Sequence, residues 1–209
     1  MERYKYPRTP HLPWSPGNTH DDVLLTNTSN FEGKEIIVTE KMDGENTSIY
    51  RDGVHARSKD SSHHPSRSWV KALQAKISSD IPQGWRLCGE NMFAEHSIQY
   101  KNLDSYFYLF AVFNDENICQ SWNDTVEWAA LLDLPIPKLL YRGKWDESKI
   151  RNLSIDEDLC EGYVVRLAEA FNYVDFAKST GKWVRQNHVQ TDSHWLHKEL
   201  KVNKLRGEA

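Results

Sequence analysis

The chain has 209 residues, of which 39% are hydrophobic, 27% are charged and 11% are aromatic, and its formal net charge is −4. This composition is typical of a globular domain with a sizeable core, excludes a membrane protein and does not suggest disorder. No apolar run approaches the roughly 20 residues that span a bilayer, and the first residues lack the apolar segment of a secretory signal, so we expect no membrane association. Cys88, Cys119 and Cys160 form no C-x-x-C pair, which argues against a zinc ribbon and favours a reducing, cytoplasmic location.

Residues 1–34 carry evenly spaced prolines at 7, 10, 13 and 16, which oppose a helix and predict an extended lead-in. Beyond it, β-branched and apolar runs predict strands at 36–39, 47–50, 54–58, 85–92, 106–113, 163–167 and 182–185. Helical spacing of apolar residues predicts helices at 66–80 and 121–133, and a basic terminal helix at 193–206. Strands in hairpins with helices inserted between them predict an α+β fold of mainly antiparallel sheets.

The charge of the chain is unevenly distributed. Residues 176–206 carry seven Lys or Arg and only Asp192 and Glu199 as acids, a local charge of +5. A local basic patch can hold phosphates in a chain that is acidic overall, and a surplus of aromatic rings offers stacking surfaces for bases. The alternative is a solvated helix face.

The sharpest local motif is Glu40-Lys41-Met42-Asp43-Gly44-Glu45-Asn46, at the end of a β-branched strand. Glycine allows a tight turn and lets a ligand approach the backbone closely. A lysine here acts as a nucleophile if its neighbours or burial depress its pKa. The plain alternative is a hairpin with a solvated lysine, because a four-position K-x-D-G pattern also recurs by chance.

Further short motifs follow in order. They are Gly89-Glu90, the apolar run from Tyr108 to Phe113, Glu161-Gly162-Tyr163-Val164-Val165-Arg166, and Lys182-Trp183-Val184-Arg185. Together with the lysine motif, this set resembles the covalent nucleotidyltransferase superfamily of ATP-dependent DNA ligases, RNA ligases and capping enzymes. Within it, the set is most similar to RNA ligases of the phage RNA-ligase-2 type. Each motif is weak alone, but five in order over residues 36–187 are jointly specific and imply a nucleotidyltransferase domain.

The resemblance implies a role for each matching residue. Lys41 matches the lysine that attacks the α-phosphorus of ATP and becomes lysyl-AMP. Glu40 matches a residue that reads the adenine amine, Glu90 the glutamate that holds the ribose hydroxyls, and Phe110 the ring that stacks on adenine.

The remaining matches concern phosphates and metal. The resemblance implies that Arg57 lies beside the ribose and phosphate, Lys182 touches the α-phosphate, and Asn46 serves the 5′-phosphate end of the nucleic acid. Glu161 matches a carboxylate near the phosphate and a Mg²⁺ or Mn²⁺ ion, which prefers oxygen ligands. Attack on phosphorus needs its charge neutralised, and Lys182 and Arg57 supply cations that we also expect to lower the pKa of Lys41.

Alternatives remain open at several positions. Tyr108 or Phe113 can replace Phe110 as the stacking ring, or Phe110 can be core; Glu90 can cap a turn, Arg57 can pair with Asp60, and Glu161 can be a solvated loop acid.

The last motif departs from the family pattern, which often has two lysines two residues apart. Here Lys182 and Arg185 are three apart and point to opposite faces of a regular strand. Either a bulge brings Arg185 to the nucleotide, or it binds elsewhere, for example nucleic acid. His188, His194 and His197 lack a usual zinc spacing, so we expect them on a helix face or against nucleic acid.

The resemblance implies an ATP-dependent RNA ligase that adenylates Lys41, passes AMP to a 5′-phosphate end, and joins that end to a 3′-hydroxyl. The expected organisation is one minimal domain over residues 1–209, with a basic tail at 188–209 and no OB or other second domain. We expect RNA as substrate, a monomer, and a partner protein as one means of gripping the substrate. The alternatives are a DNA ligase or a GTP-using capping-type enzyme, a module that binds RNA ends without chemistry, and an unrelated α+β fold.

Overall fold

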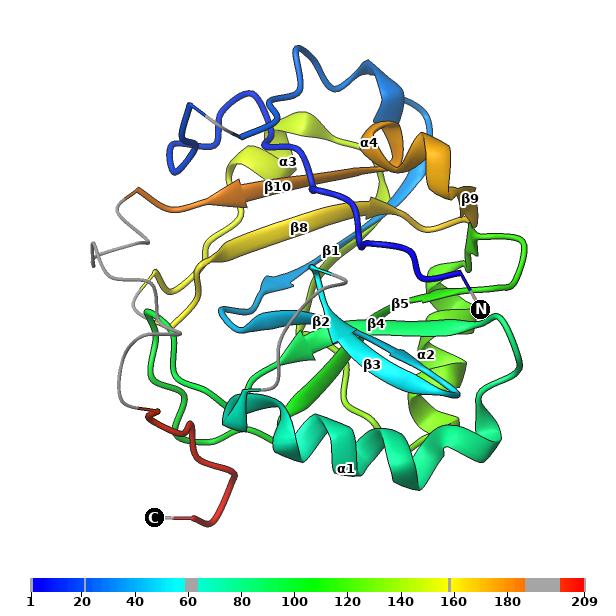
Figure 1. Cartoon of the computed structure of the whole chain (residues 1–209). Coiled ribbons are helices and arrows are strands. Elements are labelled where there is room, and N and C mark those ends of the chain that lie inside the picture. Colours follow the sequence, from blue (N-terminus) through cyan, green and yellow to red (C-terminus); the bar gives the residue numbers. More distant parts are fainter. Residues whose placement is uncertain (1, 21, 59–63, 158, 187–199, 209) are drawn as a thin grey trace.

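The computed structural model describes residues 2–20, 22–58, 64–157, 159–186 and 200–208 (Figure 1). Two antiparallel sheets make up the fold. The first has the strand order β10-β8-β1-β7, and the second has the order β3-β2-β4-β5-β6-β9. The expected α+β class is confirmed.

The strands of the first sheet are β1 (Glu35–Lys41), β7 (Leu139–Lys144), β8 (Gly162–Leu167) and β10 (Thr180–Val184). Those of the second are β2 (Glu45–Tyr50), β3 (Gly53–Ala56), β4 (Arg86–Asn91), β5 (Phe107–Phe113), β6 (Ile118–Cys119) and β9 (Phe171–Asn172). The α-helices are α1 (Ser68–Ile77), α2 (Trp122–Leu131), α3 (Glu147–Arg151) and α4 (Phe176–Ser179). Short 3-10 turns lie at Ser29–Phe31, Pro65–Arg67, Ser78–Asp80 and Tyr173–Asp175.

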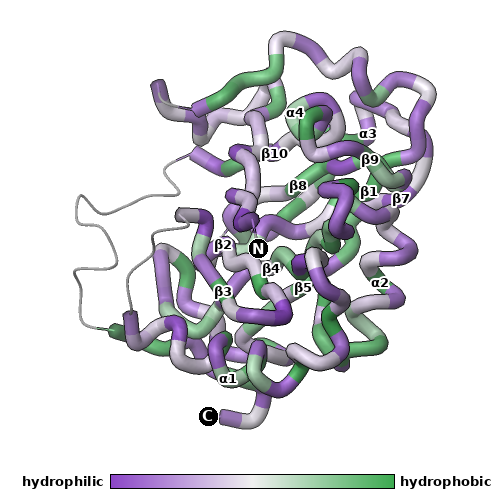
Figure 2. The backbone as a smooth tube through the Cα atoms, turned by 45° about the vertical axis from the view of Figure 1, so that its right-hand side comes forward, coloured by the Kyte–Doolittle hydropathy of each residue, from purple (hydrophilic) through white to green (hydrophobic). Residues whose placement is uncertain are grey.

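The two sheets pack against each other through a shared apolar core. Ile36 and Val38 of β1 and Val165 of β8 meet Ala111 and Phe113 of β5 there. The opposite face of the second sheet is covered by α1 and α2, with Val70, Ile77 and Ala129 packed on Ile49 and Leu87. Burial of such apolar area is the main driving force for folding. Figure 2 shows the apolar stretch of β8 within the molecule and more hydrophilic segments toward its periphery.

The strand–turn–strand prediction around Asp43-Gly44 holds for the strands but not for their pairing. Strand β1 pairs with β7 and β8, whereas β2 pairs with β3 and β4. Residues 42–44 therefore cross from one sheet to the other, and a hairpin is wrong here. The hairpin expected at Asp52-Gly53 is confirmed, since Tyr50 pairs with Gly53.

The C-terminal helix prediction is also wrong where it can be examined. Residues 200–206 form isolated bridges, Val202 with Ala94 and Leu205 with Leu103, rather than a helix. The rest of that segment, with His188, His194 and His197, lies outside the described residues. Among the described residues no helix is long and apolar enough to cross a membrane.

Candidate active site between the two sheets

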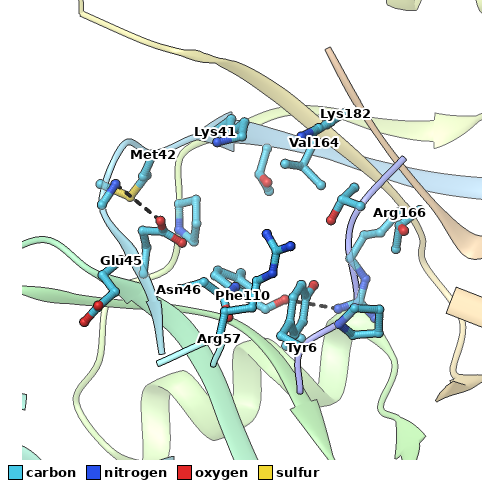
Figure 3. A pocket seen from close by; sticks show the side chains of 18 of the residues that line it. Tyr6, Lys41, Met42, Glu45, Asn46, Arg57, Phe110, Val164, Arg166 and Lys182 are labelled. Atoms are coloured by element: carbon cyan, nitrogen blue, oxygen red, sulfur yellow. Dashed lines mark hydrogen bonds between the residues drawn. The ribbon is translucent and has the colours of Figure 1, made fainter. Parts of the chain in front are cut away.

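A cavity of about 660 Å³ opens between the two sheets. One wall comes from β1, β8 and β10, and the other from β2, β4 and β5 (Figure 3). Most of the site residues predicted from sequence converge here from across the chain, whereas Glu161 and Arg185 are not among the lining residues. Those that line the cavity are Glu40, Lys41, Asn46, Arg57, Glu90, Phe110 and Lys182.

Lys41 is the last residue of β1, and its Nζ lies 2.5 Å from Oε2 of Glu161. Strand pairing enforces this contact, because Lys41 is in register with Gly162, the residue after Glu161. A side chain at position 162 would place its Cβ 1.9 Å from the Trp183 carbonyl oxygen, so only glycine lets β8 and β10 meet there. Gly162 thus allows the strand pairing that places the carboxylate of the preceding Glu161 next to Lys41.

The expectation that cations lower the pKa of Lys41 is wrong for this structure. Burial does act to lower this pKa, but the carboxylates of Glu161, Glu90 and Asp43 together raise it above its usual value. The amine is therefore held as an ammonium in an ion pair. An ion pair with a neighbouring carboxylate favours the charged form of a lysine.

The turn after Lys41 is fixed from outside the cavity. Oδ2 of Asp43 accepts three hydrogen bonds, from the Ser97 amide at 2.8 Å, the Ser97 hydroxyl at 2.7 Å and the Ile98 amide at 2.9 Å. Gly44 serves close packing, since a Cβ there would lie 2.6 Å from the Asn91 carbonyl oxygen. The Asp-Gly pair of the motif therefore positions the turn after Lys41 against the segment after β4.

Glu90 of β4 faces the same space as Lys41. Its Oε1 accepts the Gly44 amide at 3.3 Å. Burial raises the pKa of this carboxyl to about 8, with the charges of Glu161 and Asp43 adding to the rise and Lys41 opposing it. A carboxyl that is largely protonated near neutral pH can both donate and accept a hydrogen bond, which suits a pair of hydroxyls.

A β-bulge at Phe110 places two successive residues of β5 on the cavity side. Cys88 pairs with Ala111 and the next residue, Gly89, pairs with Leu109, so Phe110 is the extra residue of β5. Bulges re-aim side chains in this way, and both Phe110 and Ala111 line the cavity. Tyr108 and Phe113 are buried and are not among the lining residues, which selects Phe110 among the three rings. Val164 of β8 lines the same cavity from the other sheet.

Two groups near Phe110 were not predicted from the sequence as site residues. The ring of Tyr6 packs edge-on against Phe110, with centroids 5.2 Å apart. The guanidinium of Arg166 donates to the carbonyls of Phe110 at 3.2 Å, Gln120 at 2.7 Å and Leu167 at 3.1 Å. It thereby ties β8 to β5 at the floor of the cavity. Arg166 ends the motif that begins at Glu161, but nothing in the spacing reveals partners this far away in the sequence.

Cations gather at the Lys41 end of the cavity. Lys182 of β10 and Arg57, just after β3, both line it, and Figure 3 shows Arg57 extending into the space below Lys41. Burial lowers the pKa of Lys182, and the nearby charges of Lys41 and Arg57 lower it further. Asp22 opposes this with a carboxylate 3.7 Å from Nζ of Lys182. Cations crowded in one cavity favour an anion between them.

Arg185 does not join the nucleotide-facing group. It follows β10, its amide donates to the Glu161 carbonyl at 3.0 Å, and it is not among the residues that line the cavity. The pairing of β10 with β8 contains no bulge that would bring Arg185 to the same strand face as Lys182. Its assignment as a cofactor-binding residue therefore gains no support from the geometry. Arg57 forms no salt bridge with a described residue, and Asp60 lies outside the described part.

The residues present fit a purine nucleotide and a phosphate-bound metal. Oδ1 of Asn46 is a buried acceptor without a hydrogen-bond partner among the described residues, and it faces the cavity. Within the described part of the chain, no three His, Cys, Asp or Glu side chains form a metal cage. A lone carboxylate such as Glu161 suits an ion that takes its other ligands from phosphate and water, as Mg²⁺ commonly does.

Comparison with known proteins decides the family. The model of the RNA ligase family matches residues 34–184, which span both walls of the cavity. The chain belongs to the RNA ligase family. No curated protein sequence is similar enough to this chain to be matched.

Solved structures of ligases share the fold. A Naegleria gruberi RNA ligase mutant with ATP and Mn superposes with a TM-score of 0.56 at 20% identity, over 75% of this chain and 51% of that one. The same enzyme with PPi gives a TM-score of 0.55 at 20% identity, with the same coverage of each chain. A putative ATP-dependent DNA ligase from Aquifex aeolicus gives 0.62 at 19% identity, over 89% of this chain and 50% of that one. This member of the RNA ligase family thus spans about half the length of these solved ligases.

Proposed function

We propose that this chain is an ATP-dependent RNA ligase that works through a covalent adenylate on Lys41. The observation that carries the proposal is the position of the Lys41 amine in the wall of a cavity that is also lined by the Phe110 ring and by the cationic side chains of Arg57 and Lys182. A flat ring suits a base, and cations suit phosphates. Family membership and the Naegleria gruberi RNA ligase structures with ATP and Mn support it.

In the proposed first step, Nζ of Lys41 attacks the α-phosphorus of ATP. A phosphorus–nitrogen bond forms, the bond from this phosphorus to the pyrophosphate oxygen breaks, and pyrophosphate leaves. The ammonium proton must go first, and Glu161, 2.5 Å away, is placed to accept it. Lys182 and Arg57 neutralise charge on the phosphate oxygens. A divalent metal held by the phosphates, with Glu161 nearby, would add further charge neutralisation.

The adenine is proposed to lie between Phe110 and Val164, with Glu40 near its amine and Glu90 on the ribose hydroxyls. The side-chain amide nitrogen of Asn46 is proposed to donate a hydrogen bond to the 5′-phosphate end of the RNA. The AMP group passes to this phosphate, and a 3′-hydroxyl then displaces AMP to join the strands. We propose that residues 1–209 act as a single nucleotidyltransferase domain, in the cytoplasm and as a monomer, and that a partner protein assists the grip on RNA.

Intact-mass spectrometry after incubation with ATP and Mg²⁺ or Mn²⁺ tests the proposal. The wild type should gain one AMP, and Lys41→Arg, which keeps the charge, should gain none. Labelling by GTP instead of ATP would indicate a capping-type enzyme. Subsequent addition of 5′-phosphorylated RNA or DNA ends should discharge the AMP onto RNA. No mass gain with either nucleotide and either metal would contradict the enzymatic proposal and leave a module that binds RNA ends.

A further inference from the structure

The N-terminal lead-in lines the active-site cavity and continues beyond it. A second, shallower groove of about 360 Å³ is lined by Lys5, Tyr6, Pro7, Arg8, Arg57 and Ser58. Four of these six, Tyr6, Pro7, Arg57 and Ser58, also line the main cavity. The groove is therefore an outward extension of the nucleotide cavity at the side of Arg57. Figure 1 shows the start of the chain crossing in front of the two sheets.

The groove is basic. Three of its six lining residues are Lys5, Arg8 and Arg57, all exposed, and none of the six is an acid. Arg8 lies close enough to Arg57 that its charge, together with the larger effect of burial, lowers the pKa of Arg57, while Asp22 opposes this. Neighbouring guanidinium groups repel each other in water, and an anion placed between them removes that repulsion.

The backbone that carries these cations is anchored on both sides. The Tyr4 amide donates to the Tyr50 hydroxyl at 3.0 Å, and the Tyr173 hydroxyl donates to the Lys5 carbonyl at 2.7 Å. Farther along, the Lys182 amide donates to the Pro10 carbonyl at 2.8 Å. The Tyr6 ring packs against Phe176, with centroids 5.1 Å apart, as well as against Phe110. Tyr4 and Tyr6 are half-buried, whereas Lys5 and Arg8 are exposed. Anchoring of the segment fixes the position of these two cations, which lowers the entropy cost of binding.

We infer that Lys5, Arg8 and Arg57 form a binding groove for the sugar-phosphate backbone of the RNA strand that enters the active site. The inference rests on the proposed function and extends it to the way in which the chain holds its RNA substrate. Lys5 and Arg8 lie outside the cavity that Phe110 and Lys41 line, so a ligand held by them must extend past the nucleotide. A polyanionic strand does so, and its affinity comes mainly from such backbone contacts.

The test compares Lys5→Ala/Arg8→Ala with a control of equal charge change, Lys71→Ala/Lys76→Ala on α1, whose lysines are exposed. Binding of a 5′-phosphorylated single-stranded RNA is measured without ATP over a series of salt concentrations. Each lost contact to a single strand lowers the slope of log affinity against log salt by about 0.7. The double variant should therefore lose about 1.4 from the slope and bind roughly tenfold more weakly at low salt. The control should match the wild type.

Formation of lysyl-AMP separates the possible outcomes. The double variant should keep the wild-type rate and KM for ATP, because neither residue lines the nucleotide cavity. A raised KM for ATP would show that the groove holds ATP phosphates and would overturn the inference. If the double variant still forms lysyl-AMP and binds RNA as tightly as the control, the inference is overturned and the proposed function is not. A wild type that forms no lysyl-AMP would overturn the proposed function, while the RNA titration would still test the groove.

Discussion

Lys41, the proposed nucleophile, is held in its protonated form, because nearby carboxylates raise its pKa. Glu161 lies 120 positions along the chain from Lys41, yet strand pairing brings the carboxylate to 2.5 Å from Nζ. Sequence alone indicated the cations near Lys41 but not the balance of charges, because three acids converge from separate segments. The pKa of a buried group depends on this three-dimensional sum, which neighbours in sequence do not reveal. The amine must therefore lose a proton before it can attack phosphorus.

Glu161→Gln tests this account of Lys41. Burial lowers the pKa of the lysine, whereas Glu161 makes the largest contribution among the carboxylates that raise it. Removing that charge should lower the pKa of Lys41, so the alkaline rise in the rate of lysyl-AMP formation should move to lower pH. The maximal rate should also fall, by about 10- to 100-fold, because a proton acceptor is lost. Single-turnover rates across pH measure both. Glu169→Gln, at an exposed position, is the control, and an unmoved or higher midpoint would contradict the account.

Glu90 links the active site to stability. Its pKa is raised by burial to about 8, from a usual value of 4.5. Between these values the folded state holds a proton that the unfolded state has released, so stability falls as pH rises through this range. Glu90→Gln cannot ionise at this position. The gain in its free energy of unfolding over the wild type should therefore be larger at about pH 8.5 than at about pH 5.5. Because one pKa unit corresponds to about 1.4 kcal/mol, we expect the gain at the higher pH to exceed the gain at the lower pH by a few kcal/mol. Urea unfolding at both pH values checks this, and equal differences would argue against a raised pKa.

Among the elements, strands with β-branched runs and helices with regular apolar spacing were predictable, since their periodicity is local. The predicted strand at 106–113 and helix at 66–80 contain the observed β5 and α1. Apart from the hairpin of β2 and β3, the pairing of strands was not predictable, and neither was the bulge at Phe110. Strict alternation would put Phe110 and Ala111 on opposite faces of β5, whereas the bulge lets both of them line the cavity. That irregularity depends on how Gly89 meets β5, where a Cβ would lie 2.4 Å from the Phe107 ring.

Arg166 connects the two sheets, and its removal should affect both stability and nucleotide binding. Its guanidinium is buried and donates to three carbonyls, two of them in or beside the second sheet. Arg166→Met fills similar space but leaves these acceptors without donors, which should cost about 2–4 kcal/mol. The KM for ATP should rise several-fold, because the wall that carries Phe110 loses its tie to β8. Arg142→Met removes an exposed arginine of β7 and should cost less than about 1 kcal/mol. Similar losses in both variants, by urea unfolding, would contradict a specific tie.

On the scale of the whole molecule, the segment near the C-terminus holds the loop that anchors the turn after Lys41. Asn203 is buried, and its Nδ2 donates to the carbonyls of Met92 at 2.8 Å and Ala94 at 3.1 Å, while its Oδ1 accepts the Tyr100 amide at 2.9 Å. The segment it holds includes Ser97 and Ile98, which bind the Asp43 carboxylate. A basic terminal helix was expected here because charge was the visible signal. The folded chain instead uses one buried amide, whose partners are about 100 positions away.

Asn203→Ala should therefore loosen the turn that carries Lys41. Loss of the amide leaves two buried carbonyls and one amide unpaired, which should cost about 2–3 kcal/mol. The rate of lysyl-AMP formation, measured far below the unfolding temperature, should also fall several-fold, because Asp43 then anchors to a less ordered segment. Arg206→Ala is the matched control in the same segment, since its ion pair with Asp104 is exposed and contributes little. If Asn203→Ala unfolds at lower urea yet forms lysyl-AMP at the wild-type rate, the terminal segment stabilises the fold without positioning the nucleophile.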